Sequence, residues 1–178
     1  MAGKNIYKVA LDSLSAHVAI LDEEGVILET NRAWRDFARA NGLTENPGSI
    51  GENYIRVCEQ ASASPNDEPA LIVQGIRQVI SGDLQEFFIN YPCHSPQQQR
   101  WYALRVVRFR EPRTRKVILA HENITPLVLV QRSLAQKEEE LREQAEKLAE
   151  GNIALKVLLK HREEDRRQLE ESMLANVR

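Results

Sequence analysis

The sequence predicts an α+β domain, built on one antiparallel sheet of five strands with helices on one face, followed by a long helix. Two observations carry this prediction. Runs rich in β-branched, aliphatic and aromatic residues lie near both ends of residues 11–125, with helix-type patterns between them. Residues 126–178 are charged and carry apolar side chains at helical spacings. The chain therefore provides for one compact domain and one extension.

The N-terminal part predicts a helix and a hairpin. Residues 5–14 place apolar side chains on one face, so we expect a cap helix within residues 1–15. Residues 16–21 and 26–29 then flank a stretch whose Gly25 suits the left-handed position of a tight turn. These two runs should pair as antiparallel strands.

The middle of the domain predicts three helices. Asn31 is placed to cap the first through its side-chain oxygen, and Trp34 lies on its buried stripe. A short helix follows around residues 54–59. Pro69 fits the first turn of the third helix, which Gly82 should end.

The last part of the domain predicts three strands, at residues 84–93, 100–109 and 116–125. The break at residues 110–115 contains a proline, which cannot continue a strand ladder. The final two strands should therefore form a second antiparallel hairpin, and the chain leaves the sheet directly into the extension.

The extension repeats apolar residues every seven positions, which is typical of a coiled coil. We expect it to dimerise through a seam formed by Leu134, Leu141, Leu148, Asn152, Leu155 and Leu159. Gly151 disfavours helix and precedes a broader apolar cluster. Three alternatives stay open: one parallel coil, a rod that bends or folds back near Gly151, and a solvated single helix.

Composition excludes several classes of function. The net charge is −2 and neither part of the chain has a basic face, so we expect no direct nucleic-acid contact by this segment. No apolar run approaches the roughly 18 residues that a membrane-spanning helix needs. Cys58 and Cys93 are the only cysteines, and no signal peptide precedes them, which favours a reduced, cytoplasmic setting.

Catalytic and metal-binding patterns are also missing from the sequence. It contains no phosphate-binding glycine loop and no nucleophile elbow, so we expect no enzymatic activity. His161 could suggest a phosphoacceptor, but the charged residues after it favour a solvated helix position. Cys93, His94 and His121 could meet across strands around a metal, yet their spacing is not that of metal ligands, and we expect ordinary sheet residues.

Residues 11–125 resemble a PAS domain, the sensory module of bacterial signalling proteins. The segments that carry the resemblance are Ala19–Ile27, Asn31–Trp34, Gly51–Asn53, Tyr91–Ser95 with Arg100–Tyr102, and His121–Thr125. PAS domains end their last strand in an Asp-Ile-Thr-like triplet, and Asn123 stands here in place of the aspartate. The resemblance implies that Asn123 and Thr125 couple the domain to the helix that follows.

The resemblance also implies a small-molecule pocket between sheet and helices. We expect Tyr54, Ile76, Ala103, Arg105 and Val107 to line it. Arg105 stands among apolar neighbours and would either pair with an anionic ligand or form an ion pair at the surface or an interface, the second being favoured.

The identity of any cofactor stays unknown, but two familiar ones lack their usual anchors. Flavin-binding relatives carry a cysteine directly after the Gly-x-Asn pattern, where this sequence has Tyr54. Haem-binding relatives often use a histidine of the long helix, and the helix from Pro69 has none. We therefore expect neither a flavin adduct nor haem held by those residues.

Together these features predict a cytoplasmic sensing and dimerisation module, homodimeric through its N-terminal and C-terminal helices. Residues 152–159 resemble the segment that precedes a LuxR-type helix-turn-helix domain in bacterial transcription regulators. We therefore expect a DNA-binding output domain, absent from this sequence. The alternatives are the input module of a sensor histidine kinase or cyclase, and a structural dimerisation domain without ligand.

Overall fold

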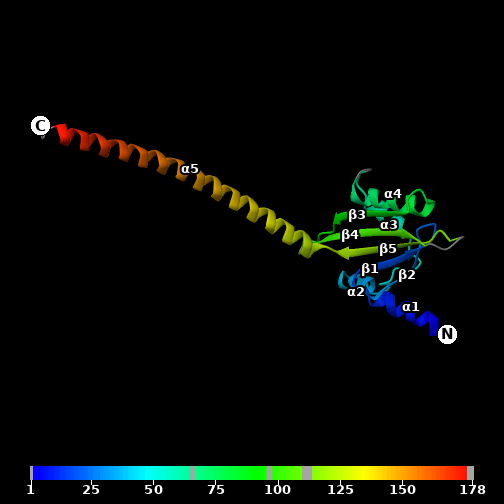
Figure 1. The fold of residues 1–178 in the computed structure, drawn as a ribbon. Coiled ribbons are helices and arrows are strands. Elements are labelled where there is room, and N and C mark those ends of the chain that lie inside the picture. Colours follow the sequence, from blue (N-terminus) through cyan, green and yellow to red (C-terminus); the bar gives the residue numbers. More distant parts are fainter. Residues whose placement is uncertain (1, 65–66, 96–97, 110–113, 176–178) are drawn as a thin grey trace. The chain divides into compact units, whose positions relative to one another are not determined.

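The computed structural model describes residues 2–64, 67–95, 98–109 and 114–175. The chain divides into two compact units, one ending at Val128 and the other beginning at Leu129. The first unit is the domain built on a sheet, and the second belongs to a single helix (Figure 1). Each unit is described by itself.

A single antiparallel sheet organises the first unit. Its strands are β1 (His17–Leu21), β2 (Ile27–Thr30), β3 (Glu86–Pro92), β4 (Trp101–Arg108) and β5 (Val117–Asn123), in the spatial order β2-β1-β5-β4-β3. Both predicted hairpins form, since β1 pairs with β2 and β4 with β5. The first and last strands also pair, with His17 opposite His121. The predicted five-stranded sheet is confirmed.

Four helices accompany the sheet: α1 (Ala2–Asp12), α2 (Arg32–Ala40), α3 (Tyr54–Ala61) and α4 (Glu68–Ser81). Each of the last three begins where a side-chain oxygen accepts a hydrogen bond from a backbone N–H of the first turn. Asn31, Asn53 and Asp67 provide these caps. Gly82, with φ of 92°, ends α4 in the left-handed conformation.

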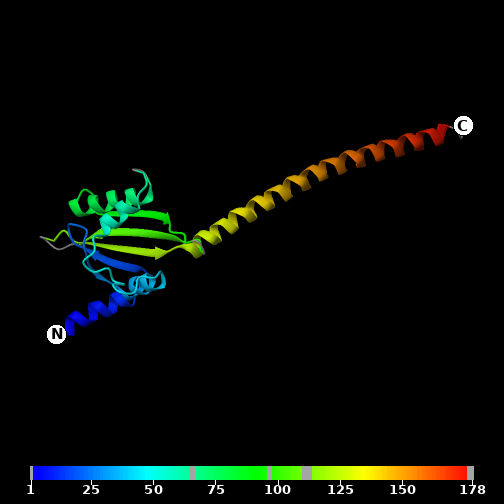
Figure 2. The same ribbon diagram turned by 180° about the vertical axis from the view of Figure 1, so that it is seen from behind.

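The core lies between the sheet and its helices. Ile76 and Val79 of α4 are fully buried there with Leu104 of β4. Gly75 faces the ring of Phe87, and a side chain at Gly75 would collide with that ring, so glycine allows α4 to approach β3 closely. Figures 1 and 2 show α4 at the β3 end of the sheet and α1 and α2 at the β2 end.

The alternation along β4 separates an inner from an outer face. Tyr102, Leu104 and Val106 are buried against the helices, whereas Arg105 on the other face is exposed. Phe88 of β3, paired with Arg105, is likewise exposed. A cavity lined partly by Tyr102 lies on the same inner face.

One helix, α5 (Thr125–Ala175), begins in the first unit and makes up the described part of the second. It continues through Gly151 without interruption. The predicted seam leucines are Leu134, Leu141, Leu148, Leu155 and Leu159, each of them more than half exposed. Among the helices in the described part of the chain, none combines enough length with enough apolar character to cross a membrane.

Candidate functional site

A cavity of about 220 Å³ lies on the inner face of the sheet, and aromatic rings form most of its wall. The lining residues come from β1, α2, α3, β4, β5 and the end of β3. They are His17, Trp34, Phe37, Tyr54, Tyr91, Cys93, Tyr102 and His121. Segments far apart in the sequence therefore contribute to one small site.

The strand register explains half of this arrangement. His17 lies opposite His121 across the β1–β5 pair, and Tyr91 lies opposite Tyr102 across the β3–β4 pair. Residues directly opposite each other in antiparallel strands point to the same face. All four side chains thus project from the inner face at the same end of the sheet, where β4 begins.

The helix caps explain much of the rest. Asn31 fixes the start of α2, and Trp34 and Phe37 then follow three residues apart on one side of that helix. Asn53 fixes the start of α3, so that Tyr54 is its first residue. The capping pattern that predicts the helices therefore also positions three rings of the cavity.

His121 is the hydrogen-bonding centre of the cavity and is only 5% exposed. Its Nδ1 lies 2.7 Å from the hydroxyl of Tyr91, and its Nε2 lies 3.3 Å from the hydroxyl of Tyr54. The ring of Trp34 packs beside it, with a centroid distance of 5.7 Å. Both ring nitrogens of His121 are therefore engaged by tyrosines.

Burial keeps the polar groups of this cavity neutral. It lowers the pKa of His121 to about 3, with a smaller contribution from His17. Burial also raises the pKa values of Tyr54 and Tyr91, further assisted by the neighbouring Cys58 and Cys93. At neutral pH the histidine is an uncharged imidazole and both tyrosines are uncharged phenols.

Ring contacts close the wall between these polar groups. His17 packs on Phe37 with a centroid distance of 4.6 Å, and Phe37 meets Tyr102 edge-on at 6.0 Å. The guanidinium of Arg100 lies 5.6 Å from the centre of the Phe37 ring and donates a hydrogen bond to Asn41 at 3.4 Å. No Asp, Glu, Lys or Arg is among the described residues that line the cavity.

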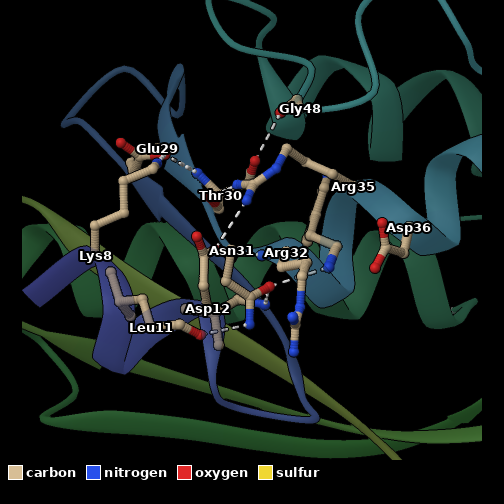
Figure 3. Close-up of polar contacts among 12 residues, drawn as sticks. Lys8, Leu11, Asp12, Glu29, Thr30, Asn31, Arg32, Arg35, Asp36 and Gly48 are labelled. Atoms are coloured by element: carbon tan, nitrogen blue, oxygen red, sulfur yellow. Dashed lines mark hydrogen bonds and ion pairs between the residues drawn. The ribbon is translucent and has the colours of Figure 1, made fainter.

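Asn31 anchors the wall to the rest of the domain (Figure 3). Its side-chain oxygen accepts from the backbone N–H groups of Val18 and Trp34, each at 3.0 Å. Its amide nitrogen donates to the carbonyls of Leu11 and Ala16, at 3.1 and 2.8 Å. Asn31 is 1% exposed, and the bond that it accepts from Val18 is fully buried. One side chain thus joins β1, α2 and the end of α1.

An ion pair reinforces this junction. Arg35 of α2 lies 2.9 Å from Asp12 of α1 and also donates to the carbonyl of Thr30 (Figure 3). Burial alone would raise the pKa of Asp12, but hydrogen bonds from Arg35 and from the backbone of Arg32 outweigh it, and the pKa is lowered. The helix that carries two cavity rings is therefore fixed to α1.

A short path leads from the cavity to α5. His121 lies on β5 only four residues before Thr125, the first residue of α5. The hydroxyl oxygen of Thr125 accepts from the backbone N–H of Trp101 at 2.9 Å, and Asn123 accepts from the backbone N–H of Thr125 at 3.0 Å. The two predicted coupling residues therefore tie the start of α5 to β4 and β5.

The pocket residues expected from the sequence are not all together. Tyr54 lines the cavity, whereas Ile76 belongs to the packed core. Ala103, Arg105 and Val107 lie on the outer face of β4, where Arg105 pairs with Glu86 at 2.6 Å. Arg105 therefore forms the surface ion pair that the sequence favoured over a contact with an anionic ligand. Both faces of β4 are largely apolar in sequence. The prediction assigned the face that carries Arg105 to the pocket, and that face is the outer one.

Six further cavity residues were not predicted from the sequence: His17, Trp34, Phe37, Tyr91, Tyr102 and His121. The sequence signal for four of them is an aromatic or histidine side chain at an inward-facing position of β1, β3, β4 and β5. Within the described ranges no group of three His, Cys, Asp or Glu side chains could hold a metal ion. His121 is occupied by its tyrosines, and Nδ1 of His94 accepts from the backbone of Arg100.

One curated relative of this chain is the uncharacterized 104.1 kDa protein in the hypE 3′ region of Rhodobacter capsulatus. It is 38% identical over 104 residues, which are 56% of this chain and 11% of that protein. The chain thus matches only about a tenth of the length of that relative.

Two solved structures resemble the fold. An RNA-binding light-oxygen-voltage receptor is 17% identical, with a TM-score of 0.55, over 80% of this chain and 38% of that one. The Vibrio cholerae VqmA dimer, described with LuxR-type receptors, is 14% identical, with a TM-score of 0.50, over 74% of this chain and 56% of that one. At such identities the likeness concerns the fold alone.

A family model described as the PAS fold matches residues 11–128. This range covers well over half of the chain and contains the whole sheet, the aromatic cavity and the first turn of α5. The chain therefore belongs to the PAS fold family, the sensory module of signalling proteins.

Proposed function

We propose that this chain senses a small molecule in the cavity around His121 and transmits the bound state, as a homodimer, through α5 to an output segment. One observation carries the proposal. The central residue of the cavity lies on the same strand that continues into α5, four residues before the helix begins. A ligand that shifts His121 therefore acts on the strand from which α5 emerges.

The strand β4, which is hydrogen-bonded to the start of α5, also forms part of the cavity wall. Tyr102 lines the cavity, and the neighbouring Trp101 accepts from the backbone N–H of Ile124 at 2.9 Å and donates to Thr125. A change in the cavity thus acts through both β4 and β5 on the same helical turn. Asn123 and Thr125 are the coupling residues in this proposal.

The exposed leucines of α5 support a paired helix. A row of apolar side chains every seven residues, each more than half exposed in one chain, gains free energy when a second helix covers it. Asn152 lies in the same seam, where a polar residue costs stability and limits the pairings that are favourable. The bound molecule would shift the population between two packings of the paired helices.

The output in this proposal is a DNA-binding helix-turn-helix domain in the cytoplasm. Residues 152–159 resemble the segment that precedes such domains. VqmA, one of the structures with a similar fold, is a dimer described in connection with the DNA-binding mechanisms of LuxR-type receptors. An output of the kinase or cyclase type would use the same cavity and the same helix.

The sensed molecule is proposed to be diffusible and not covalently attached. Tyr54 stands where flavin-binding relatives have their reactive cysteine, and its phenol forms part of the cavity wall. Its hydroxyl contacts His121, so the position is already used in the hydrogen bonding of the cavity. A reversible ligand can exchange within this network.

Two measurements on the full chain test the proposal. Native mass spectrometry of protein from its source organism should give a homodimer with an additional small mass. Oxidative cross-linking of Leu134→Cys, Leu141→Cys and Leu148→Cys should link the two chains and should change when the bound molecule is removed. The parent protein, which keeps Cys58 and Cys93, is the control. A bare monomer, or one unchanging cross-link pattern, would contradict the proposal.

A further inference from the structure

We infer that the His121 cavity takes an uncharged, planar molecule of about one ring whose polar group both donates and accepts hydrogen bonds. This inference rests on the proposed function, because it names the chemical class of the sensed molecule. It stands on four properties of the cavity: its volume, its walls, the charges around it and the hydrogen-bonding capacity of the Tyr91 hydroxyl.

The volume limits the size of the ligand. The cavity measures about 220 Å³. An apolar cavity of roughly 150 Å³ is large enough for benzene in another protein. The space around His121 therefore accommodates one six-membered ring with a small substituent, whereas flavins and haem are much larger.

The walls favour a flat, unsaturated ring. Phe37, Tyr54 and Tyr102 face the cavity from three different elements, and neighbouring rings pack at centroid distances of 4.6 to 6.1 Å. Such separations are typical of offset-stacked and edge-to-face pairs. A planar ligand can enter this packing as one more ring, whereas a saturated ring of equal size cannot stack.

The surroundings disfavour a charged ligand. No carboxylate or cationic side chain is among the described lining residues that could pair with an opposite charge. Arg100 contacts the ring of Phe37 and its guanidinium bonds Asn41, but it is not part of the lining. The lowered pKa of His121 reports the same property, because burial there penalises a positive charge.

Proton counting defines the polar end of the ligand. Neutral His121 offers one N–H donor and one acceptor nitrogen, and each tyrosine offers one O–H. The two hydrogen bonds of His121, to Tyr54 and Tyr91, use two of these three protons. The N–H of His121 can therefore point to Tyr91, while Tyr54 donates to the ring, or to Tyr54, while Tyr91 donates to the ring. In each case the tyrosine that accepts from His121 keeps its own proton free.

Of the two tyrosines bonded to His121, Tyr91 is the one with unused hydrogen-bonding capacity. The hydroxyl of Tyr54 also interacts with the neighbouring thiol of Cys58. The hydroxyl of Tyr91 bonds His121 and, among the described residues, makes no second hydrogen bond. When His121 donates to Tyr91, the Tyr91 hydroxyl can donate to a ligand. When Tyr91 donates to His121, its oxygen can accept from a ligand. A carboxamide, which offers both a carbonyl and an N–H, can bond Tyr91 in either case.

A series of three probes with one shape tests the inference. Benzamide, benzoate and benzamidinium are planar single rings that carry no charge, a negative charge and a positive charge at neutral pH. Isothermal titration of the full chain, previously stripped of bound molecules by unfolding and refolding, measures the Kd of each. We expect benzamide to bind at least tenfold more tightly than either charged probe.

A pair of variants then locates the contact. Tyr91→Phe should weaken benzamide binding about tenfold, the effect of losing one buried hydrogen bond. Tyr7→Phe removes the same hydroxyl from a residue that is 74% exposed on α1, and should leave the Kd unchanged.

Equal or tighter binding of benzoate or benzamidinium would overturn the inference and leave the proposed function standing. Failure of all three probes to bind would also overturn it, because a cavity of this kind must accept one of them. The proposed function is decided separately, by the retained mass and the cross-links of the source protein. A benzamide Kd that Tyr91→Phe leaves unchanged would contradict the assigned contact.

Discussion

The hydroxyl of Tyr91 lies 2.7 Å from Nδ1 of His121, although the strands that carry these residues are not neighbours. Tyr91 lies on β3 and His121 on β5, and β4 runs between them. The bond therefore crosses β4 on the inner face of the sheet, beside the buried Tyr102 and Leu104. It links β3 to β5 through side chains, in addition to the backbone ladders.

Loss of this bond should destabilise the domain. Tyr91→Phe leaves Nδ1 of the buried His121 without its partner, at a cost of about 1–3 kcal/mol in the free energy of unfolding. Urea denaturation of the two proteins measures the difference. Tyr7→Phe, on the exposed surface of α1, should change the free energy by less than about 0.5 kcal/mol. A Tyr91→Phe protein as stable as the parent would mean that the bond is absent in solution.

Stability should fall in mild acid because of His121. Its pKa is about 3 in the folded state, against an ordinary 6.5. Its contribution is complete above about pH 6.5 and is lost as pH falls toward 3, since only the unfolded state takes up the proton in that window. The slope should approach about 1.4 kcal/mol per pH unit. Urea midpoints between neutral pH and pH 4.5 measure it.

The variant His121→Gln should remove most of this slope. His17, whose pKa is also lowered by burial, contributes in the same direction and should leave a smaller remainder. Asp67 has a pKa of about 2, against an ordinary 3.8, so its contribution to stability is lost only between these two values. That window lies below the pH 4.5 limit of the urea measurements. An unchanged slope in His121→Gln would show that His121 is protonated in the folded protein or accessible to water.

Asn31 should contribute more to stability than the other asparagine cap. Asn31→Ala removes a helix cap together with a buried bond to Val18 and partly buried bonds to Leu11 and Ala16, with an expected cost of about 3 kcal/mol. Asn53→Ala removes the cap of α3 and one bond to Glu24 from a less buried position, and should cost about 1 kcal/mol. Equal losses in thermal unfolding would contradict the anchoring role of Asn31.

Thr125 should matter for coupling more than for folding. Thr125→Val keeps the shape of the side chain but removes the oxygen that accepts from the N–H of Trp101, at an expected cost of about 1 kcal/mol. In this variant the cross-links along α5 should no longer respond to removal of the bound molecule. Thr44→Val, on an exposed loop, is the matched control and should respond like the parent. A full response in Thr125→Val would exclude this path.

Local patterns were sufficient to predict the architecture. The strand runs, the turn at Gly25, the cap at Asn31 and the stop at Gly82 each depend on a few neighbouring residues, and the structure contains all of them. The course of α5 at Gly151 was left open by the sequence. A single glycine costs only about 1 kcal/mol, which leaves continuation and a break close in free energy.

The cavity could not be predicted in the same way. Its members come from six elements, and which of them meet depends on strand register and on which face of β4 the helices cover. Trp101 to Val107 carry apolar residues at both odd and even positions, so the alternation does not identify the inner face. Arg105 was informative in hindsight, because an arginine is rarely placed on a buried face without a partner.

The central claim is that occupancy of the His121 cavity changes the pairing of α5. The most direct test is the distance between spin labels attached to an unnatural amino acid at Glu150, outside the leucine seam, in the two chains of a dimer. Double electron–electron resonance should give different distance distributions for the protein as isolated and for the same protein stripped of its bound molecule. Identical distributions, or no interchain distance at all, would contradict the claim.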